Sequence, residues 1–214
     1  MFPSSFGSRA GILRPLFIYT GASLERERAH LTIVGLISDT HGRLPERALW
    51  ALADSDHIIH AGDIGDPDIL LELEELAPTT AVLGNNDYRE YGDEVGRFAR
   101  PVIDGVRFLV AHYPSDVRIG YNGCPGLAPG DPIPQICIHG HTHVPEIVTG
   151  SDALPARFIV CAGSPSRPRG GFPPTIGHIE IEDGRVERVR VETFGGGVVL
   201  EAVAEDAGSR GARP

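Results

Sequence analysis

The feature that most constrains this chain is a short apolar run that ends in a carboxylate and an imidazole. Residues 31–37 are apolar and rich in β-branched side chains, which is typical of a strand buried in a parallel sheet. Asp39 and His41 follow almost at once. In an open α/β sheet, ligands bind beyond the carboxyl ends of the strands, so both side chains can face one point there. Taken alone, Asp39 could equally cap a following helix.

The next segments alternate between strand and helix. Apolar residues at helical spacing predict helices over 44–53 and 69–76, the second beginning with a proline and acidic first turn. Strands are expected over 56–61 and 79–83. Three βα units in succession imply a parallel sheet with right-handed crossovers.

After residue 93 the pattern changes to β-structure. Residues 102–111 predict a hairpin around an Asp-Gly turn. Residues 113–134 are rich in Gly and Pro and show no regular period. We expect a second sheet, completed by strands over 135–138, 157–161, 175–181 and 185–191.

Length and local composition indicate one folded domain. The 214 residues suit a single domain of ordinary size. We expect a flexible N-terminal extension over 1–30, the domain over 31–192 and a disordered tail over 193–214. An apolar patch at 16–19 is too short to span a membrane, and it makes a poor signal peptide.

Charge and cysteine content limit the classes of function. The net charge of −10 argues against non-specific binding of nucleic acid or anionic membranes, because both need basic surface. A small phosphate ester remains a suitable partner, because bound cations can reverse the local charge. Three cysteines without a Cys-x-x-Cys spacing disfavour disulfides and thiolate zinc sites, so we expect a cytoplasmic protein.

Potential metal ligands recur at five strand ends. A single histidine after a strand is more often structural than a ligand, but seven such groups in this arrangement are hard to explain that way. Imidazole mixed with hard oxygen donors suits Mn²⁺, Fe²⁺, Zn²⁺ or Ni²⁺ better than Ca²⁺. Seven ligands suit two ions that share a carboxylate. The candidate metal ligands are Asp39, His41, Asp63, Asn85, His112, His141 and His143.

These residues resemble the motifs of the calcineurin-like metallophosphoesterase family. The motifs, in the family's order, stand here as Asp39-Thr40-His41, Gly62-Asp63, Gly84-Asn85-Asn86-Asp87, His112 and Gly140-His141-Thr142-His143. The short length and the stretch 163–166 look most similar to the small bacterial and archaeal phosphodiesterase branch, which includes the retromer subunit Vps29. The resemblance implies an α/β fold, an αββα sandwich of two facing mixed β-sheets flanked by helices.

The resemblance also implies a role for each ligand. One divalent ion is expected on Asp39, His41 and His143, the other on Asn85, His112 and His141, with Asp63 bridging them. Manganese is the first expectation, and nickel, iron and zinc are alternatives. The implied activity is that of a metal-dependent phosphodiesterase or phosphatase, in which a metal-bridging hydroxide attacks the phosphate in line. Asp63 and Asn86 are the candidate catalytic residues. Asp87 either orients an imidazole or shapes a turn.

Two departures from the family pattern bear on the substrate. Many members have histidine where this chain has Asn86, and asparagine can donate a hydrogen bond but cannot deliver a proton. We therefore expect a preference for esters with good leaving groups, or a metal-bound water as the acid. The lone histidine is often followed by Gly-His in the family, whereas Tyr113-Pro114 follows His112 here, which removes a possible substrate contact but no predicted metal ligand. Arg167 and Arg169 either contact substrate phosphate or are simply solvated.

The alternative hypothesis is a metallophosphoesterase fold that serves as a protein-interaction scaffold, as in the Vps29 branch. The presence of all seven candidate ligands argues against a scaffold, because a scaffold has no chemical need for them. A dinucleotide-binding enzyme is disfavoured, because no Gly-x-Gly-x-x-Gly follows the first strand. Exposed edges of two sheets favour a homodimer without requiring one.

Overall fold

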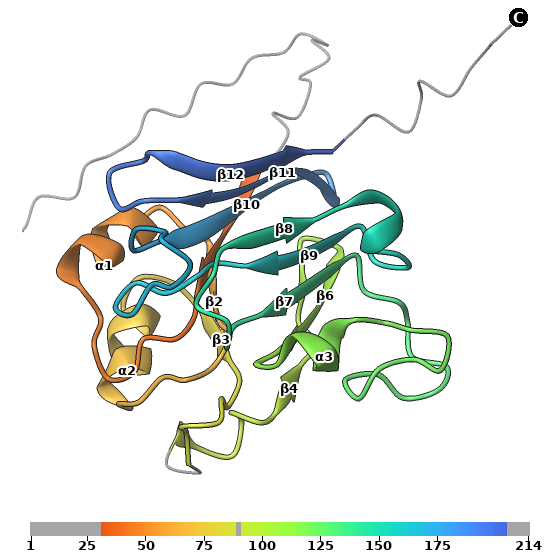
Figure 1. Ribbon diagram of the computed structural model, residues 1–214, viewed down its shortest axis with the longest axis horizontal. Coiled ribbons are helices and arrows are strands. Elements are labelled where there is room, and N and C mark those ends of the chain that lie inside the picture. Colours follow the sequence, from red (N-terminus) through yellow and green to blue (C-terminus); the bar gives the residue numbers. More distant parts are fainter. Residues whose placement is uncertain (1–30, 89–90, 205–214) are drawn as a thin grey trace, which may run out of the picture.

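The structure is a computed structural model and describes residues 31–88 and 91–204. Two mixed β-sheets face each other across an apolar core (Figure 1). Helices α1 (Glu46–Leu52) and α2 (Asp68–Glu74) cover the outer face of the first sheet. The predicted sandwich is confirmed. The second sheet is covered on its outer face by the short helix α3 (Pro114–Val117) and by loops.

The first sheet contains the strands of the predicted βα units and the last three strands of the described residues. Its strands are β1 (Leu31–Ile37), β2 (His57–His60), β3 (Thr79–Ala81), β10 (Ile176–Glu182), β11 (Arg185–Glu192) and β12 (Val198–Val203). They lie in the order β12-β11-β10-β1-β2-β3. Strands β1, β2 and β3 are parallel, as the βα units predict, whereas β10, β11 and β12 form an antiparallel meander beside β1.

The second sheet contains the predicted hairpin. Its strands are β4 (Phe98–Ala99), β5 (Val102–Ile103), β6 (Val106–Ala111), β7 (Ile136–His139), β8 (Glu146–Val148) and β9 (Phe158–Cys161). The order is β4-β6-β7-β9-β8, and β5 pairs with β6. Asp104 and Gly105 join β5 to β6 and both have positive φ, 44° and 75°, as a type I′ turn requires.

The core explains why the site lies where it does. Inward-facing side chains of both sheets pack together, for example Leu36 on β1, Phe108 on β6 and Val160 on β9. Strands β6, β7 and β9 are parallel to one another, like β1, β2 and β3. The loops after the carboxyl ends of these two parallel sets meet: Ala61, which follows β2, contacts His112, which follows β6. One end of the sandwich therefore gathers residues from distant parts of the chain.

Two sequence-based expectations need correction. Strands β10 and β11 were expected in the second sheet, but they extend the first, where β10 pairs with β1. The expected disordered tail is ordered over β12, whose Leu200 and Ala202 pack against the core. The expected extension, residues 1–30, and the end of the expected tail, residues 205–214, lie outside the described residues. No helix in the described ranges is long and apolar enough to cross a membrane.

Candidate metal centre

The loops at this end of the sandwich hold an uncommon backbone conformation. Seven non-glycine residues in the described ranges have positive φ, and five of them are predicted ligands. These five are Asp39 (φ 56°), His41 (50°), Asp63 (55°), His141 (68°) and His143 (59°). The left-handed region is sterically unfavourable for residues with a Cβ, and such strain is found mostly at functional sites. The fold tolerates this cost at the strand ends that carry the candidate ligands.

Four of these side chains form one compact group. Asp39, His41, Asp63 and His143 each place a ligand atom within 4.8 Å of the others, and the group could hold a metal ion. His143 Nε2 lies 3.1 Å from His41 Nε2 and 3.3 Å from Asp39 Oδ1. His41 Nε2 lies 3.6 Å from Asp63 Oδ2. Imidazole nitrogens and carboxylate oxygens therefore converge on one point. Of the four side chains, His41 is half-buried and the other three are buried.

The other three candidates form a second group beside the first. Asn85 Oδ1 lies 2.9 Å from His141 Nδ1 and 3.2 Å from His112 Nε2. His112 Nε2 also lies 3.5 Å from Asp63 Oδ1. Asp63 thus stands between the groups, with Oδ2 toward His41 and Oδ1 toward His112. The structure brings all seven predicted ligands together, and their imidazole, amide and carboxylate donors fit divalent transition-metal ions.

Hydrogen bonds to backbone carbonyls orient two of the imidazoles. His143 Nδ1 lies 2.7 Å from the carbonyl oxygen of Arg167, and His112 Nδ1 lies 2.8 Å from that of Ala61. A carbonyl oxygen only accepts, so each Nδ1 carries the proton and donates it. Each Nε2 then faces the centre, and once the proton that His112 Nε2 donates to Asp63 is lost, both Nε2 atoms can offer a lone pair to a metal ion.

The local charges suit a cation site. Burial acts to raise the pKa of Asp63, but the hydrogen bonds from His112 and Asn86 outweigh it and hold this pKa well below its usual range. Asp63 therefore stays anionic at neutral pH. Burial lowers the pKa of His41, and the charge of Arg167 adds to this effect against the attraction of Asp63. Burial raises the pKa of Asp39, opposed by His112 and His143.

Serine residues after β9 support the first ligand loop, and the sequence interpretation assigned them no contact. Ser164 Oγ donates to the carbonyl oxygen of Asp39 and Ser166 Oγ to that of Thr40, both at 2.8 Å. Ser38 Oγ donates in return to the carbonyl oxygen of Gly163, also at 2.8 Å. The run 163–166 was visible in the sequence, but only the fold shows that it holds the Asp39 loop.

Two neighbouring residues contact the ligands directly. Asn86 donates to Asp63 twice, from its backbone nitrogen to Oδ1 at 2.8 Å and from Nδ2 to Oδ2 at 2.6 Å. The ring of Tyr113 packs against His141 with centroids 4.6 Å apart, and against His112 at 5.5 Å. Asn86 and Tyr113, which belong to the two departures from the family pattern, therefore both contact candidate ligands.

Two further histidines are structural supports. His60 is buried, and its Nε2 lies 2.9 Å from Thr40 Oγ1 while its Nδ1 accepts from the backbone nitrogen of Gly62. Burial lowers the pKa of His60 to about 4, so its imidazole is neutral at neutral pH. His139 is also buried, and its Nε2 lies 3.0 Å from Glu146 Oε2. His60 joins the loop after β1 to the loop after β2.

Asp87 joins two ligand loops through their backbones. Among the described residues its hydrogen bonds go to backbone nitrogens and a tyrosine hydroxyl and not to an imidazole, so it closes the turn at Gly84 and, beyond that prediction, reaches the loop after β2. Its Oδ2 accepts from the backbone nitrogens of Gly84 at 2.8 Å and Ile64 at 3.1 Å. Its Oδ1 accepts from the nitrogen of Gly65 at 3.0 Å and from the hydroxyl of Tyr91 at 3.2 Å. The carboxylate ties the loop after β2 to the loop after β3, and these loops carry Asp63 and Asn85.

We expect Asp87→Asn to weaken both the fold and metal binding. An amide NH₂ group in place of one oxygen faces backbone N–H donors, which leaves partly buried donors unsatisfied at a cost of about 1 kcal/mol. Looser ligand loops should reduce metal affinity by about 10- to 100-fold. Denaturant unfolding and metal titration measure the two effects. Asp93→Asn, at an exposed position nearby, is the control and should behave as wild type. Equal behaviour of the two variants would contradict this role for Asp87.

The fold and site define a class of protein: a two-sheet sandwich with a candidate metal centre built from loops at its strand ends. The family follows from the sequence comparison. The chain belongs to the calcineurin-like phosphoesterase superfamily, whose domain model matches residues 33–184. It is 37% identical over 147 residues to a probable metallophosphoesterase of Methanothermobacter thermautotrophicus, which is 64% of this chain and 79% of that protein. It is 33% identical over 160 residues to a probable metallophosphoesterase of Methanocaldococcus jannaschii, which is 71% of this chain and 77% of that protein.

Solved structures show the same fold at lower sequence identity. The phosphoesterase YfcE from E. coli aligns with a TM-score of 0.60 and 21% identity, over 80% of this chain and 99% of its own. Vps29 from Entamoeba histolytica, solved with Zn²⁺, aligns with a TM-score of 0.59 and 19% identity, over 80% and 99%. These similarities establish the fold alone, so the function has to be inferred from the residues of the site.

Proposed function

We propose that this protein is a dinuclear metal-dependent phosphoesterase that acts chiefly on phosphodiesters. The observation that carries the proposal is the position of Asp63, buried between two groups of donors with one oxygen toward each. Asp39, His41 and His143 would hold one ion, and Asn85, His112 and His141 the other. A pair of divalent ions, when bound, neutralises phosphate oxygens and lowers the pKa of water.

The chain's own residues then fix the geometry. The carbonyl oxygens of Ala61 and Arg167 keep the imidazoles of His112 and His143 in one tautomer, and Asp63 supplies a permanent negative charge between the sites. Asn86 is positioned by Asp63 and presents a donor but no acid. Arg167 lies close enough to lower the pKa of His41, so its charge could assist an anionic substrate. Among metals we favour Mn²⁺, and among compartments the cytoplasm.

The direct test uses metal-stripped protein. Mn²⁺, Ni²⁺, Zn²⁺ and Mg²⁺ are added back singly, and hydrolysis of bis-p-nitrophenyl phosphate and p-nitrophenyl phosphate is followed. We expect turnover only with added metal, and faster turnover of the diester. A protein that binds two ions and hydrolyses neither ester with any metal would overturn the proposal. We would then favour the second candidate function, a non-catalytic scaffold, because Vps29 structures are among the structural neighbours of this protein.

The reaction should respond to a proton donor at position 86. We expect Asn86→His to speed hydrolysis of a diester with a phenol leaving group by about tenfold or more, since a general acid typically contributes 10²–10⁴-fold. The hydrolysis rate of the matching p-nitrophenol diester should change little, because its leaving group needs less protonation. Asn86→Gln, which adds length but no acid, is the control. The idea fails if the histidine variant leaves the phenyl ester rate unchanged.

A further inference from the structure

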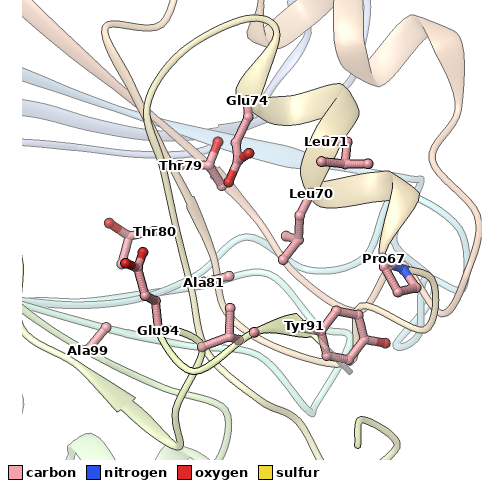
Figure 2. A pocket seen from close by; sticks show the side chains of 12 residues that line it. Pro67, Leu70, Leu71, Glu74, Thr79, Thr80, Ala81, Tyr91, Glu94 and Ala99 are labelled. Carbon is pink, nitrogen blue, oxygen red and sulfur yellow. The ribbon is translucent and has the colours of Figure 1, made fainter. Parts of the chain in front are cut away.

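A groove of about 560 Å³ lies at the edge of the first sheet, apart from the candidate metal centre (Figure 2). Helix α2 forms one wall, strand β3 lies along it, and residues 91–99 form the other wall. None of the seven candidate metal ligands lines it. The groove therefore needs an explanation that the proposed phosphoesterase activity does not supply.

The backbone along this groove is an open strand edge. Toward β2, Ile58 donates to the carbonyl oxygen of Pro78, and Val82 donates to that of His60. Because alternate residues of a parallel strand bond to the same neighbour, Thr79 and Ala81 direct their backbone groups away from β2. Within residues 31–88 and 91–204, no strand pairs with this outer side of β3.

The same edge already accepts a neighbour one step further along. Leu83, the next residue in the outward-facing register, donates to the carbonyl oxygen of Gly96 at 2.8 Å. Val82 and Gly96 form an isolated parallel bridge there. An added segment would therefore continue a pairing that the chain begins, and it would satisfy both backbone groups of Thr79 and the N–H group of Ala81.

The side chains around the edge are apolar at the floor and acidic at the rim. Leu70 and Ala81 are buried and Val95 is half-buried, whereas Leu71 on the rim is 59% exposed. Figure 2 shows Glu74 on the α2 side and Glu94 on the opposite wall. The twelve lining residues include these two acids and no lysine or arginine. The groove therefore suits a segment that combines apolar and basic side chains.

We propose that this groove binds an extended segment of a partner protein, rich in apolar and basic residues, as an added strand beside β3. The segment's main chain would bond to Thr79 and Ala81. Its apolar side chains would cover Leu70 and Ala81, and its lysine or arginine side chains would lie near Glu74 and Glu94. The proposal is independent of the metal centre and holds whether or not the protein is an enzyme.

The test uses a dye-labelled seven-residue peptide of alternating lysine and valine, with binding to the full chain followed by fluorescence anisotropy. We expect saturable binding, weakened about fivefold in a Glu74→Gln, Glu94→Gln double variant, since exposed ion pairs contribute up to about 1 kcal/mol each. Glu72→Gln, an exposed change on α2 outside the groove, should leave binding unchanged. N-methylation of the valines should abolish binding, because it removes the donors of an added strand.

Nuclear magnetic resonance then locates the peptide. The amide signals of Thr79 and Ala81 should shift on titration, and those of the candidate metal ligands should not. The proposal is overturned if no binding occurs, if a peptide with glutamate in place of lysine binds equally well, or if the double variant binds as wild type. Concentration-dependent dimerisation that occupies this edge would also overturn it, since the occupant would then be a second copy of this chain.

Discussion

Asp63→Asn is expected to reduce metal-dependent phosphoesterase turnover by about 10³-fold or more, because it changes the one residue shared by both donor groups. Asparagine preserves the size of the side chain but removes its negative charge and replaces one oxygen by an NH₂ group. The oxygens of Asp63 lie 3.6 Å from His41 Nε2 and 3.5 Å from His112 Nε2, so the new donor would face one of the two groups. Both sites should lose affinity together.

The measurement combines turnover of bis-p-nitrophenyl phosphate with the number of ions retained after gel filtration. We expect fewer than two ions per chain in the variant. Asp54→Asn changes an exposed aspartate and provides the matched control, with full turnover. A variant that retains both ions and near-normal turnover would show that Asp63 does not bridge, and the proposed mechanism would be wrong.

The sequence predicted most local elements because their signals are local. The βα units, the hairpin around Asp104 and Gly105, and the buried strands all carry their patterns within ten or so residues. Pairing between distant strands has no such signal. The alternating apolar residues of β10 fit the inner face of either sheet, so only tertiary contact decides that β10 pairs with β1. Strand β12 follows a glycine-rich turn and is partly exposed, and its composition resembles that of a tail.

The site divides in the same way. The ligand candidates could be predicted because a strand end is recognisable in sequence and Asp, Asn and His are metal ligands wherever the chain places them. Their supports could not be predicted, because an ordinary residue becomes a support only through its partner. Ser164 contacts Asp39 across 125 positions of sequence, and Asp87 binds backbone nitrogens, which carry no sequence signal. The family pattern marked the segment of Ser164 without giving it a contact, and it left Asp87 with two alternative roles, neither of which was a tie between the loops after β2 and β3.

A second large effect should come from adding one methyl group at Gly84. The structure packs the backbone of Gly84 directly against Asp63, and a Cβ there would overlap a carboxylate oxygen and the backbone nitrogen of Asp63. The Cγ atom of Asp63 would lie only 2.8 Å away. Because backbone atoms cannot rotate aside, one of the two ligand loops must move. We expect Gly84→Ala to cost about 3 kcal/mol of stability, at the upper end for overpacking, and to remove most metal-dependent turnover.

The control is Gly96→Ala, a glycine-to-alanine change twelve positions further along the chain. A Cβ at Gly96 would meet only the backbone oxygen of Phe98, at an ordinary 3.8 Å. Both variants make the same chemical change, so a difference between them reports the close approach at Asp63. Denaturant unfolding gives the stability, and turnover with added metal gives the state of the site. If Gly84→Ala matched Gly96→Ala in both, the loop after β3 would not be held against Asp63, and the two donor groups would not share it.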